Sequence, residues 1–144
     1  MKIKDLLTEK RLHHLEEMVA EITVDELKSK RKRNEIFKLV EISNPDDFAN
    51  GHIDGAINIP LDLLATETSK RFRKFQQIVI YVQEAASSVG TVAAVRLQRL
   101  EFSNVVLLRG GKEAWRNAGL PLTGQEDAEG ETETTEESDQ TWLK

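Results

Sequence analysis

The stretch Ile78-Val79-Ile80-Tyr81-Val82-Gln83-Glu84-Ala85-Ala86-Ser87-Ser88 decides how this chain folds. Its apolar part predicts a buried strand over residues 77–82, and its polar part predicts a short loop. Apolar residues at helical spacing then predict a helix over residues 87–100 that packs on a sheet. A strand-loop-helix junction of this kind directs backbone N–H groups toward one point and suits an anion or a nucleophile. The place for a nucleophile holds Val82, whose side chain is an inert hydrocarbon.

Strand and helix patterns alternate on both sides of this junction. Thr23 with Glu26 forms a capping-box pattern, and Asn44 before Pro45 marks another helix start. The alternation predicts an α/β fold with a mostly parallel sheet. Further strands are expected over residues 37–42 and 105–108, and residues 51–60 are expected to form a turn that leads to a short strand. Further helices are expected after Thr23, over 45–50, over 61–68 and over 112–117.

Two pairs of apolar side chains are expected to face the core between these elements. Leu63 and Leu64 should point inward from the helix over residues 61–68. Phe72 and Phe75 should anchor the connection that leads to the central strand.

The composition fits one domain with its own core. The chain has 144 residues, of which 39% are hydrophobic and 31% charged, so it needs neither disulfides nor metals to fold. It contains no cysteine, which excludes disulfides, thiolate catalysis and Cys-ligated metals. No apolar stretch approaches the roughly 20 residues of a membrane span, and the first residues lack the apolar segment of a signal peptide. We therefore expect a cytoplasmic protein that makes no membrane contact.

The negative charge of the chain is concentrated at its C-terminal end. Residues 124–144 contain eight acidic residues and one basic residue, whereas residues 1–123 contain 19 basic and 17 acidic ones. A segment so acidic and so poor in apolar residues is predicted to be a disordered tail. Its end, Trp142-Leu143, could serve as a short docking motif, although a passive solubilising tail is the favoured interpretation.

An apolar stripe predicts a helix over residues 3–19, within an N-terminal extension of residues 1–20. Such a helix could pack on the core of its own domain or against a second copy, which would make a homodimer. The stripe consists of Ile3, Leu7, Leu12, Leu15, Val19 and Ile22.

A basic run, Lys28-Ser29-Lys30-Arg31-Lys32-Arg33, lies in the second predicted helix. It could contact nucleic acid or acidic lipid. We favour a solvated helix end whose cations complement the helix dipole, because no aromatic residues interleave with the run. A nucleic-acid partner is therefore not expected.

Three segments together resemble the rhodanese-like domain family. Residues 39–60 contain Gly51-His52-Ile53 and end in Gly55-Ala56-Ile57-Asn58-Ile59-Pro60, residues 78–100 contain the strand-loop-helix unit, and residues 105–115 contain Gly110-Gly111 and Trp115. The resemblance covers residues 21–123 and leaves the extension (1–20) and the acidic tail (124–144) outside the domain. It implies a three-layer α/β/α fold with a mostly parallel central sheet of about five strands.

Members of this family transfer sulfur through a cysteine persulfide that stands at the end of the central strand. The resemblance places this cysteine at Val82, with a loop whose N–H groups would surround the sulfur and with Ser88 at the start of the helix. The loop consists of Val82, Gln83, Glu84, Ala85, Ala86 and Ser87. The resemblance also implies a structural role for Glu41, His52, Gly110, Gly111 and Trp115.

Four departures from the family pattern argue against sulfur transfer. Val82 cannot form a persulfide, because this chemistry needs a thiolate. Glu84 should put a carboxylate inside a loop that holds an anionic sulfur in active members, where like charges repel. Ala85 replaces a small flexible glycine, and Ser43 stands where the family's Asp-x-Arg pattern, here Glu41-Ile42-Ser43, has its arginine.

Other chemistry finds little support in the sequence. Ser87 and Ser88 have no nearby His or Lys to activate a hydroxyl, so we expect them to cap the following helix. His13 and His14 are adjacent and point apart on a helix, and His52 is expected to bond backbone within its turn. No metal site and no cofactor are therefore expected.

The leading hypothesis is a catalytically inactive rhodanese-like domain that acts as a protein-binding or regulatory module. One rival is a sulfurtransferase-related protein whose loop still binds an anionic sulfur substrate, or which works with a cysteine supplied by a partner. A second rival, ranked last, is an adaptor that binds nucleic acid through residues 28–33.

Overall fold

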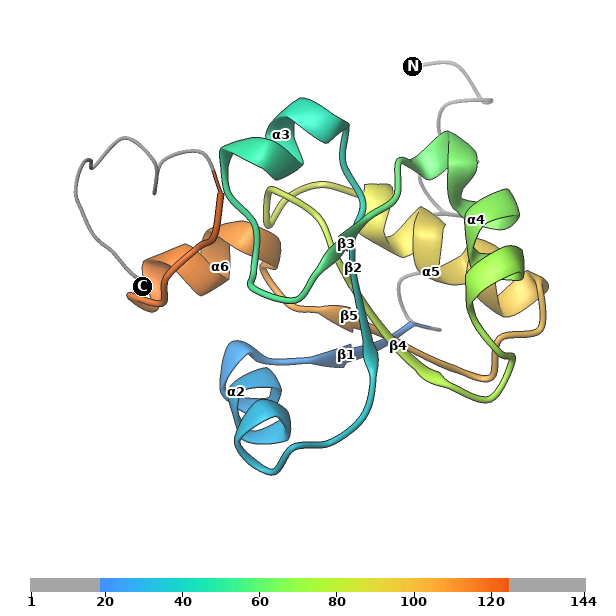
Figure 1. Ribbon diagram of the computed structural model, residues 1–144, viewed down its shortest axis with the longest axis horizontal. Helices are drawn as coiled ribbons and strands as arrows, with labels where there is room; N and C mark the ends of the chain where they lie inside the picture. The colour runs from blue at the N-terminus through green and yellow to red at the C-terminus, as the bar shows by residue number, and fades with distance from the viewer. Residues whose placement is uncertain (1–18, 125–144) are drawn as a thin grey trace, which may run out of the picture.

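The sheet at the centre of the computed structural model, which describes residues 19–124, has five strands in the order β1-β5-β4-β2-β3 (Figure 1). All four pairings are parallel, so every strand ends at the same edge of the sheet. The prediction of an α/β fold with about five mostly parallel strands is confirmed. The strands are β1 (Ala20–Ile22), β2 (Lys38–Glu41), β3 (Ile57–Asn58), β4 (Gln77–Tyr81) and β5 (Asn104–Leu108).

Helices cover both faces of the sheet and complete the expected three layers. Strand residues alternate between the faces, so Ile80 packs in the apolar cluster under α4 and α5, whereas Val79 packs in the cluster under α2 and α6. None of the helices in residues 19–124 is long and apolar enough to cross a membrane. The helices are α2 (Val24–Lys32), α3 (Pro45–Asn50), α4 (Leu64–Arg71) after a short 3-10 turn (Leu61–Leu63), α5 (Val89–Arg99) and α6 (Gly111–Asn117).

Two helix starts expected from the sequence, at Thr23 and at Asn44, are confirmed. The Thr23 side chain accepts a hydrogen bond from the Glu26 N–H, and the Glu26 carboxylate accepts one from the Thr23 N–H. At α3, Asn44 Oδ1 accepts a bond of 2.8 Å from the Asp47 N–H. These motifs are readable in the sequence because both partners lie within three residues of each other.

The strand β1 corrects the expected helix stripe at its C-terminal end. Ala20, Glu21 and Ile22 pair with β5, and Val19 is buried in the α4/α5 cluster. A strand of three residues is too short to show the alternation of apolar and polar residues that marks a strand. The helical spacing of Val19 and Ile22 therefore predicts a helix where the structure has a strand. The expected boundary between residues 20 and 21 falls inside this strand, and the rest of the predicted N-terminal helix and the acidic tail beyond Gly124 lie outside the described residues.

Two further expectations about core residues are wrong. Leu64 is buried, but Leu63 is 46% exposed because it belongs to the 3-10 turn that precedes α4. Phe72 is buried, but Phe75 is 71% exposed. Phe75 lies in a tight turn that the Arg73 and Gln76 backbone bond closes, and the turn directs its side chain outward.

Candidate functional site

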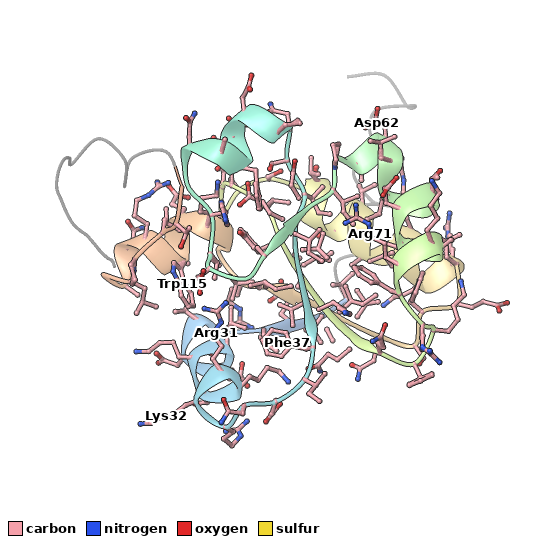
Figure 2. All side chains as sticks on the ribbon, in the orientation of Figure 1. Arg31, Lys32, Phe37, Asp62, Arg71 and Trp115 are labelled. Atoms are coloured by element: carbon pink, nitrogen blue, oxygen red, sulfur yellow. The ribbon has the colours of Figure 1, made fainter. Side chains whose placement is uncertain are left out.

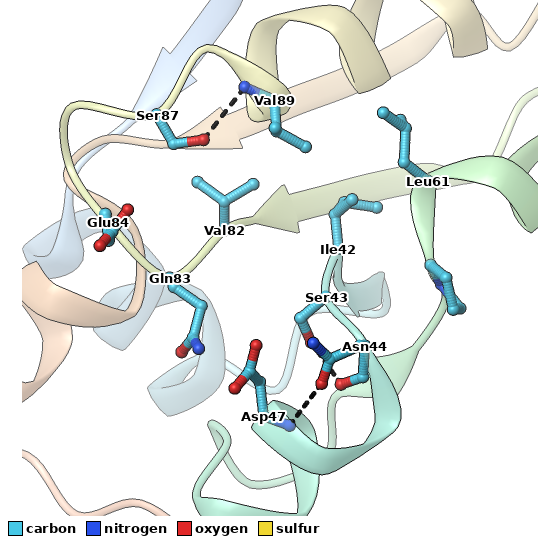
Figure 3. Close-up of a pocket in the computed structure, with 11 residues that line it drawn as sticks. Ile42, Ser43, Asn44, Asp47, Leu61, Val82, Gln83, Glu84, Ser87 and Val89 are labelled. Carbon is cyan, nitrogen blue, oxygen red and sulfur yellow. Dashed lines mark hydrogen bonds between the residues drawn. The ribbon is translucent and has the colours of Figure 1, made fainter.

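A pocket of about 360 Å³ opens where β2 and β4 end (Figure 3). Its walls come from the segment after β2, from Pro60 and Leu61, and from the loop after β4. Ligands of open parallel sheets bind at this edge, so the pocket occupies the position expected for a functional site. The lining residues are Ile42, Ser43, Asn44, Asp47, Pro60, Leu61, Val82, Gln83, Glu84, Ser87 and Val89.

Val82 follows β4 directly and forms an apolar part of the pocket lining. Its side chain is only 6% exposed and belongs to the α4/α5 cluster. Gly90 of α5 lies against it, since a Cβ on Gly90 would stand 3.5 Å from Val82 Cγ1. The side chain at the position assigned to the cysteine is thus a packed core residue.

The loop after β4 and the start of α5 use several backbone N–H groups in hydrogen bonds within the protein. Ala85 N–H donates to Glu113 Oε1 of α6 (3.1 Å), and Ser87 N–H donates to the Glu84 carbonyl (3.2 Å). Val89 N–H donates to Ser87 Oγ (3.1 Å). An anion site of the expected kind needs such groups to converge on the ligand, and these three are committed elsewhere.

The serine pair only partly fulfils the expected capping role. The helix α5 begins at Val89, and the Ser88 side chain makes no capping hydrogen bond in the described structure. Ser87 provides the hydroxyl oxygen that accepts the Val89 N–H instead. The expectation of a capping bond is therefore confirmed for Ser87 and wrong for Ser88, which occupies the N-cap position with a helical backbone (φ −84°, ψ −5°) instead of the extended one typical of a cap. The helix also starts two residues later than predicted.

The pocket is acidic. Asp47 and Glu84 are among its lining residues, and Figure 3 shows the Asp47 carboxylate directed toward the space beside Gln83. Glu84 is exposed at the loop surface, so its carboxylate is not enclosed by the loop as the sequence suggested. None of the residues that line the pocket in the described part of the chain is basic. Asp47 was not singled out from the sequence, since an acidic residue in the first turn of a helix is ordinary.

Gly110 and Gly111 bring α6 against the loop. A Cβ on Gly111 would stand 2.3 Å from the Val82 carbonyl oxygen, and its φ of +62° favours glycine as well. The close approach allows Lys112 N–H to donate to the Val82 carbonyl (2.7 Å) and Glu113 N–H to donate to the Gln83 carbonyl (3.0 Å). The double glycine therefore holds the start of α6 beneath the loop.

A buried ion pair lies below the pocket. Lys112 Nζ stands 3.0 Å from Glu41 Oε2, and the two side chains are 2% and 0% exposed. Ser43 Oγ also bonds Glu41 Oε2 (2.6 Å), and Lys112 Nζ donates to the Asp47 carbonyl (3.3 Å). Glu41 Oε1 is buried with no hydrogen-bond partner among the described residues. The sequence indicated Glu41 but gave no reason to single out Lys112, which follows the double glycine in an exposed-looking helix turn.

Tyr81 adds a neutral polar group to this buried region. Its hydroxyl oxygen accepts a bond of 3.0 Å from the Ile53 N–H, which anchors the turn after α3. Burial raises the pKa of Tyr81 above its ordinary value, and the neighbouring charge of Glu41 raises it further. The phenol is therefore held in its protonated form.

His52 and Trp115 lie away from the pocket and support the fold. His52 Nδ1 bonds the Phe48 carbonyl at 2.9 Å, and its ring stacks on Phe48. Trp115 is buried and donates from Nε1 to the Pro121 carbonyl (2.9 Å). These contacts agree with the structural roles expected for both residues.

Three side chains of the basic run, those of Lys30, Arg31 and Arg33, make contacts within the protein. Lys30 pairs with Glu35 at 2.8 Å, and Arg33 pairs with the same carboxylate at 2.6 Å. The Lys30 bond and then the Arg33 bond hold the pKa of Glu35 below its usual value. Arg31 bonds the Asp54 carbonyl and lies over the Trp115 ring, as Figure 2 shows, whereas Lys32 points to solvent. No group of acidic or histidine side chains in residues 19–124 is arranged to hold a metal ion.

Known proteins resemble this chain in sequence and in fold. The model of the rhodanese-like domain family matches residues 23–118. A sulfurtransferase of Allochromatium vinosum is 33% identical over 109 residues, which cover 76% of this chain and 99% of that protein. An HTH-type transcriptional regulator of Mycobacterium tuberculosis is 38% identical over 105 residues, which cover 70% of this chain and 43% of the regulator.

The fold also matches solved structures. A crystal structure of a Bacillus halodurans protein superimposes with a TM-score of 0.69 at 28% identity and covers 81% of this chain and 85% of its own. The solution structure of a rhodanese-like domain from Anabaena reaches the same TM-score at 23% identity, covering 86% of this chain and 93% of its own. The chain contains no cysteine, so the family's sulfurtransferase nucleophile is absent. With the family match, the shared fold and the double-glycine support of the loop, the chain belongs to the rhodanese-like domain family.

Proposed function

We propose that this protein is a rhodanese-like domain without sulfurtransferase activity that acts by binding another protein. The observation that carries the proposal is Val82, a packed hydrocarbon in the lining of a pocket on an otherwise complete scaffold. No thiolate is available in the chain to attack a sulfur donor, and sulfur transfer through a persulfide requires one.

The chemistry around Val82 supports a changed role for the whole pocket. Two carboxylates, those of Asp47 and Glu84, line a site that would have to receive an anion for sulfur transfer. Negative charges in the lining of a pocket oppose the binding of an anion. The Ala85 N–H donates its hydrogen bond to the Glu113 carboxylate, so this loop donor is not available to an incoming anion.

A binding role is compatible with how the family occurs. In the Mycobacterium tuberculosis regulator the matching segment makes up 43% of the protein, so a related domain occurs there beside other segments. A domain that contributes a surface needs a stable scaffold and an accessible pocket. Both are present in residues 19–124.

The test is a transfer assay from thiosulfate to cyanide. The full chain is expected to show no transfer above the uncatalysed rate. The variant V82C is also expected to remain inactive, because the two carboxylates and the bond between Ala85 and Glu113 are still present. V89C is the matched control, since it places a thiol elsewhere in the lining of the same pocket.

Two results would contradict the proposal. Transfer by the unmodified chain would show that activity does not need the missing thiol. Full activity in V82C, but not in V89C, would contradict the changed role of the pocket, because it would show that only the thiol was lost and that the loop keeps its catalytic form.

A further inference from the structure

We propose that the pocket beside Val82 receives a lysine or arginine side chain of a protein partner. The inference rests on the proposed binding function and specifies the chemistry that the partner presents. Three observations carry the inference. The pocket lining is negatively charged, the neighbouring cations are already paired with other carboxylates, and the walls are apolar.

The charge of the pocket is negative and uncompensated by basic residues in its lining. The Asp47 side chain points into the space beside Gln83 in Figure 3, and Glu84 adds a second carboxylate at the exposed rim of the pocket. Two cations that lie near the pocket and its loop in the fold are already paired. Lys112 is bound to Glu41 at 3.0 Å, and Arg109 is bound to Glu21 at 3.0 Å.

The helix dipoles do not reverse this sign. The helix α5 begins beside the pocket, and a helix N-terminus carries about half a positive charge. Two carboxylates outweigh that contribution. The first N–H of α5, on Val89, is moreover satisfied by Ser87 Oγ rather than open to a ligand.

The walls favour a cation carried on an aliphatic stem. Ile42, Leu61, Val82 and Val89 form apolar lining, with Pro60 beside them. Lysine and arginine bury their methylene stems on apolar surface while the charged end seeks polar partners. The Asp47 carboxylate and the Gln83 side-chain oxygen in the pocket, and the Glu84 carboxylate at its rim, can accept hydrogen bonds from such an end group.

The pocket size suits one side chain of this kind. Its volume of about 360 Å³ lies at the small end of the range for ligand pockets, roughly 300–1,000 Å³. A bare metal ion would leave the apolar walls unused, and thiosulfate would meet two negative charges. A side chain that combines charge and stem uses both properties of the lining.

The experiment is an NMR titration of the full ¹⁵N-labelled chain with capped tripeptides. The probe is acetyl-Ala-Arg-Ala-amide, compared with the norleucine and glutamate peptides of the same length and with sodium thiosulfate. The arginine peptide should shift the amide signals of Asp47, Gln83, Glu84 and Ser87 saturably. The norleucine peptide should bind more weakly, and the glutamate peptide and thiosulfate should leave these signals unchanged.

Two variants test the role of the carboxylates. Asp47→Asn and Glu84→Gln should each weaken arginine-peptide binding about threefold, as expected for a partly exposed charge pair. Asp46→Asn is the matched control, because Asp46 lies in the same first turn of α3, is exposed and does not line the pocket. It should leave the dissociation constant unchanged.

The outcomes separate this inference from the proposed function. Equal binding of the arginine and norleucine peptides would overturn the assignment of a cation, as would the absence of any saturable shift. Shifts caused by thiosulfate without sulfur transfer would overturn it too, while the chain would still lack sulfurtransferase activity. Thiosulfate binding together with transfer would overturn both.

Discussion

The buried pair of Lys112 and Glu41 ties the start of α6 to the end of β2, directly below the pocket. Burial of two charges is costly, and their attraction compensates only when the geometry and the surrounding hydrogen bonds are good. Here Ser43 Oγ and the Asp47 carbonyl complete the coordination, but Glu41 Oε1 lacks a partner among the described residues. The pair therefore gives the site a fixed geometry more than it gives the fold stability.

This balance predicts an asymmetry between single and double substitutions. Lys112→Met should lower the free energy of unfolding by about 3–5 kcal/mol, because it leaves the Glu41 carboxylate buried without its cation. Glu41→Gln combined with Lys112→Met should recover most of this loss, since neither remaining side chain carries a charge. Urea unfolding of the parent and of both variants measures the difference.

The exposed Lys32 provides the control for loss of a positive charge. Lys32→Met should change the free energy of unfolding by less than about 0.5 kcal/mol. A double variant that is less stable than Lys112→Met alone would show that the buried charge is not the source of the loss.

At the scale of elements, the loop after β4 and the start of α6 form one unit. Two α6 N–H groups, on Lys112 and Glu113, donate to loop carbonyls, and the Glu113 carboxylate accepts the Ala85 N–H. Gly111 makes this contact possible because its backbone passes against the Val82 carbonyl. The shape of the pocket therefore depends on a helix that contributes no lining residue of its own.

Alanine substitutions at Gly119 and Gly111 distinguish the cost of a left-handed backbone from the cost of a steric clash with the loop. At Gly119 (φ +81°) an added Cβ would meet no atom within 4 Å. Gly119→Ala should therefore lower the free energy of unfolding by about 1–2 kcal/mol, through the left-handed backbone conformation alone. Gly111→Ala should cost more, because its Cβ would also stand 2.3 Å from the Val82 oxygen. Urea unfolding measures both costs.

The two variants should also differ in the NMR spectrum. Gly111→Ala should move the amide signals of residues 83–87, whereas Gly119→Ala should leave them in place. Equal costs and equal spectra would mean that α6 does not support the loop.

What the sequence could predict at this scale follows from how far apart the partners lie. The capping box at Thr23 and the Asn44 cap were readable because each motif spans four residues. The bonds from α6 to the loop were not readable, because Glu113 and Ala85 are 28 residues apart and meet only in the folded sheet. The same holds for Lys112, whose burial depends on Glu41 from a different strand, and for β1, whose three residues become a strand only beside β5.

At the scale of the whole molecule, the structural domain is larger than the segment that the family model matches. The match covers residues 23–118, yet Val19 and Ile22 are buried, one in each apolar cluster. The Ile22 carbonyl accepts the Arg109 N–H at 2.8 Å, which closes the β1 edge of the sheet. Beyond residue 118, Pro121 accepts the Trp115 bond, and Thr123 pairs with His52 through two backbone bonds of 2.8 and 2.7 Å.

These contacts predict that a chain trimmed to residues 23–118 is much less stable than one of residues 19–124. Loss of buried Val19 and Ile22 alone removes about 1.5–3 kcal/mol for each side chain. The stability of a whole domain is only about 5–15 kcal/mol, so the shorter chain should lie near the limit of folding. Urea unfolding followed by Trp115 fluorescence compares the two chains, since both contain Trp115 and neither contains Trp142.

An intermediate chain of residues 19–118 assigns the loss to one end or the other. Because β1 is retained in it, this chain should unfold between the two, with the His52–Thr123 and Trp115–Pro121 bonds missing. If residues 23–118 unfolded at the same urea concentration as residues 19–124, then β1 and the segment after α6 would not contribute to the stability of the domain. The expected order of stability instead makes them part of the scaffold that holds the pocket in shape.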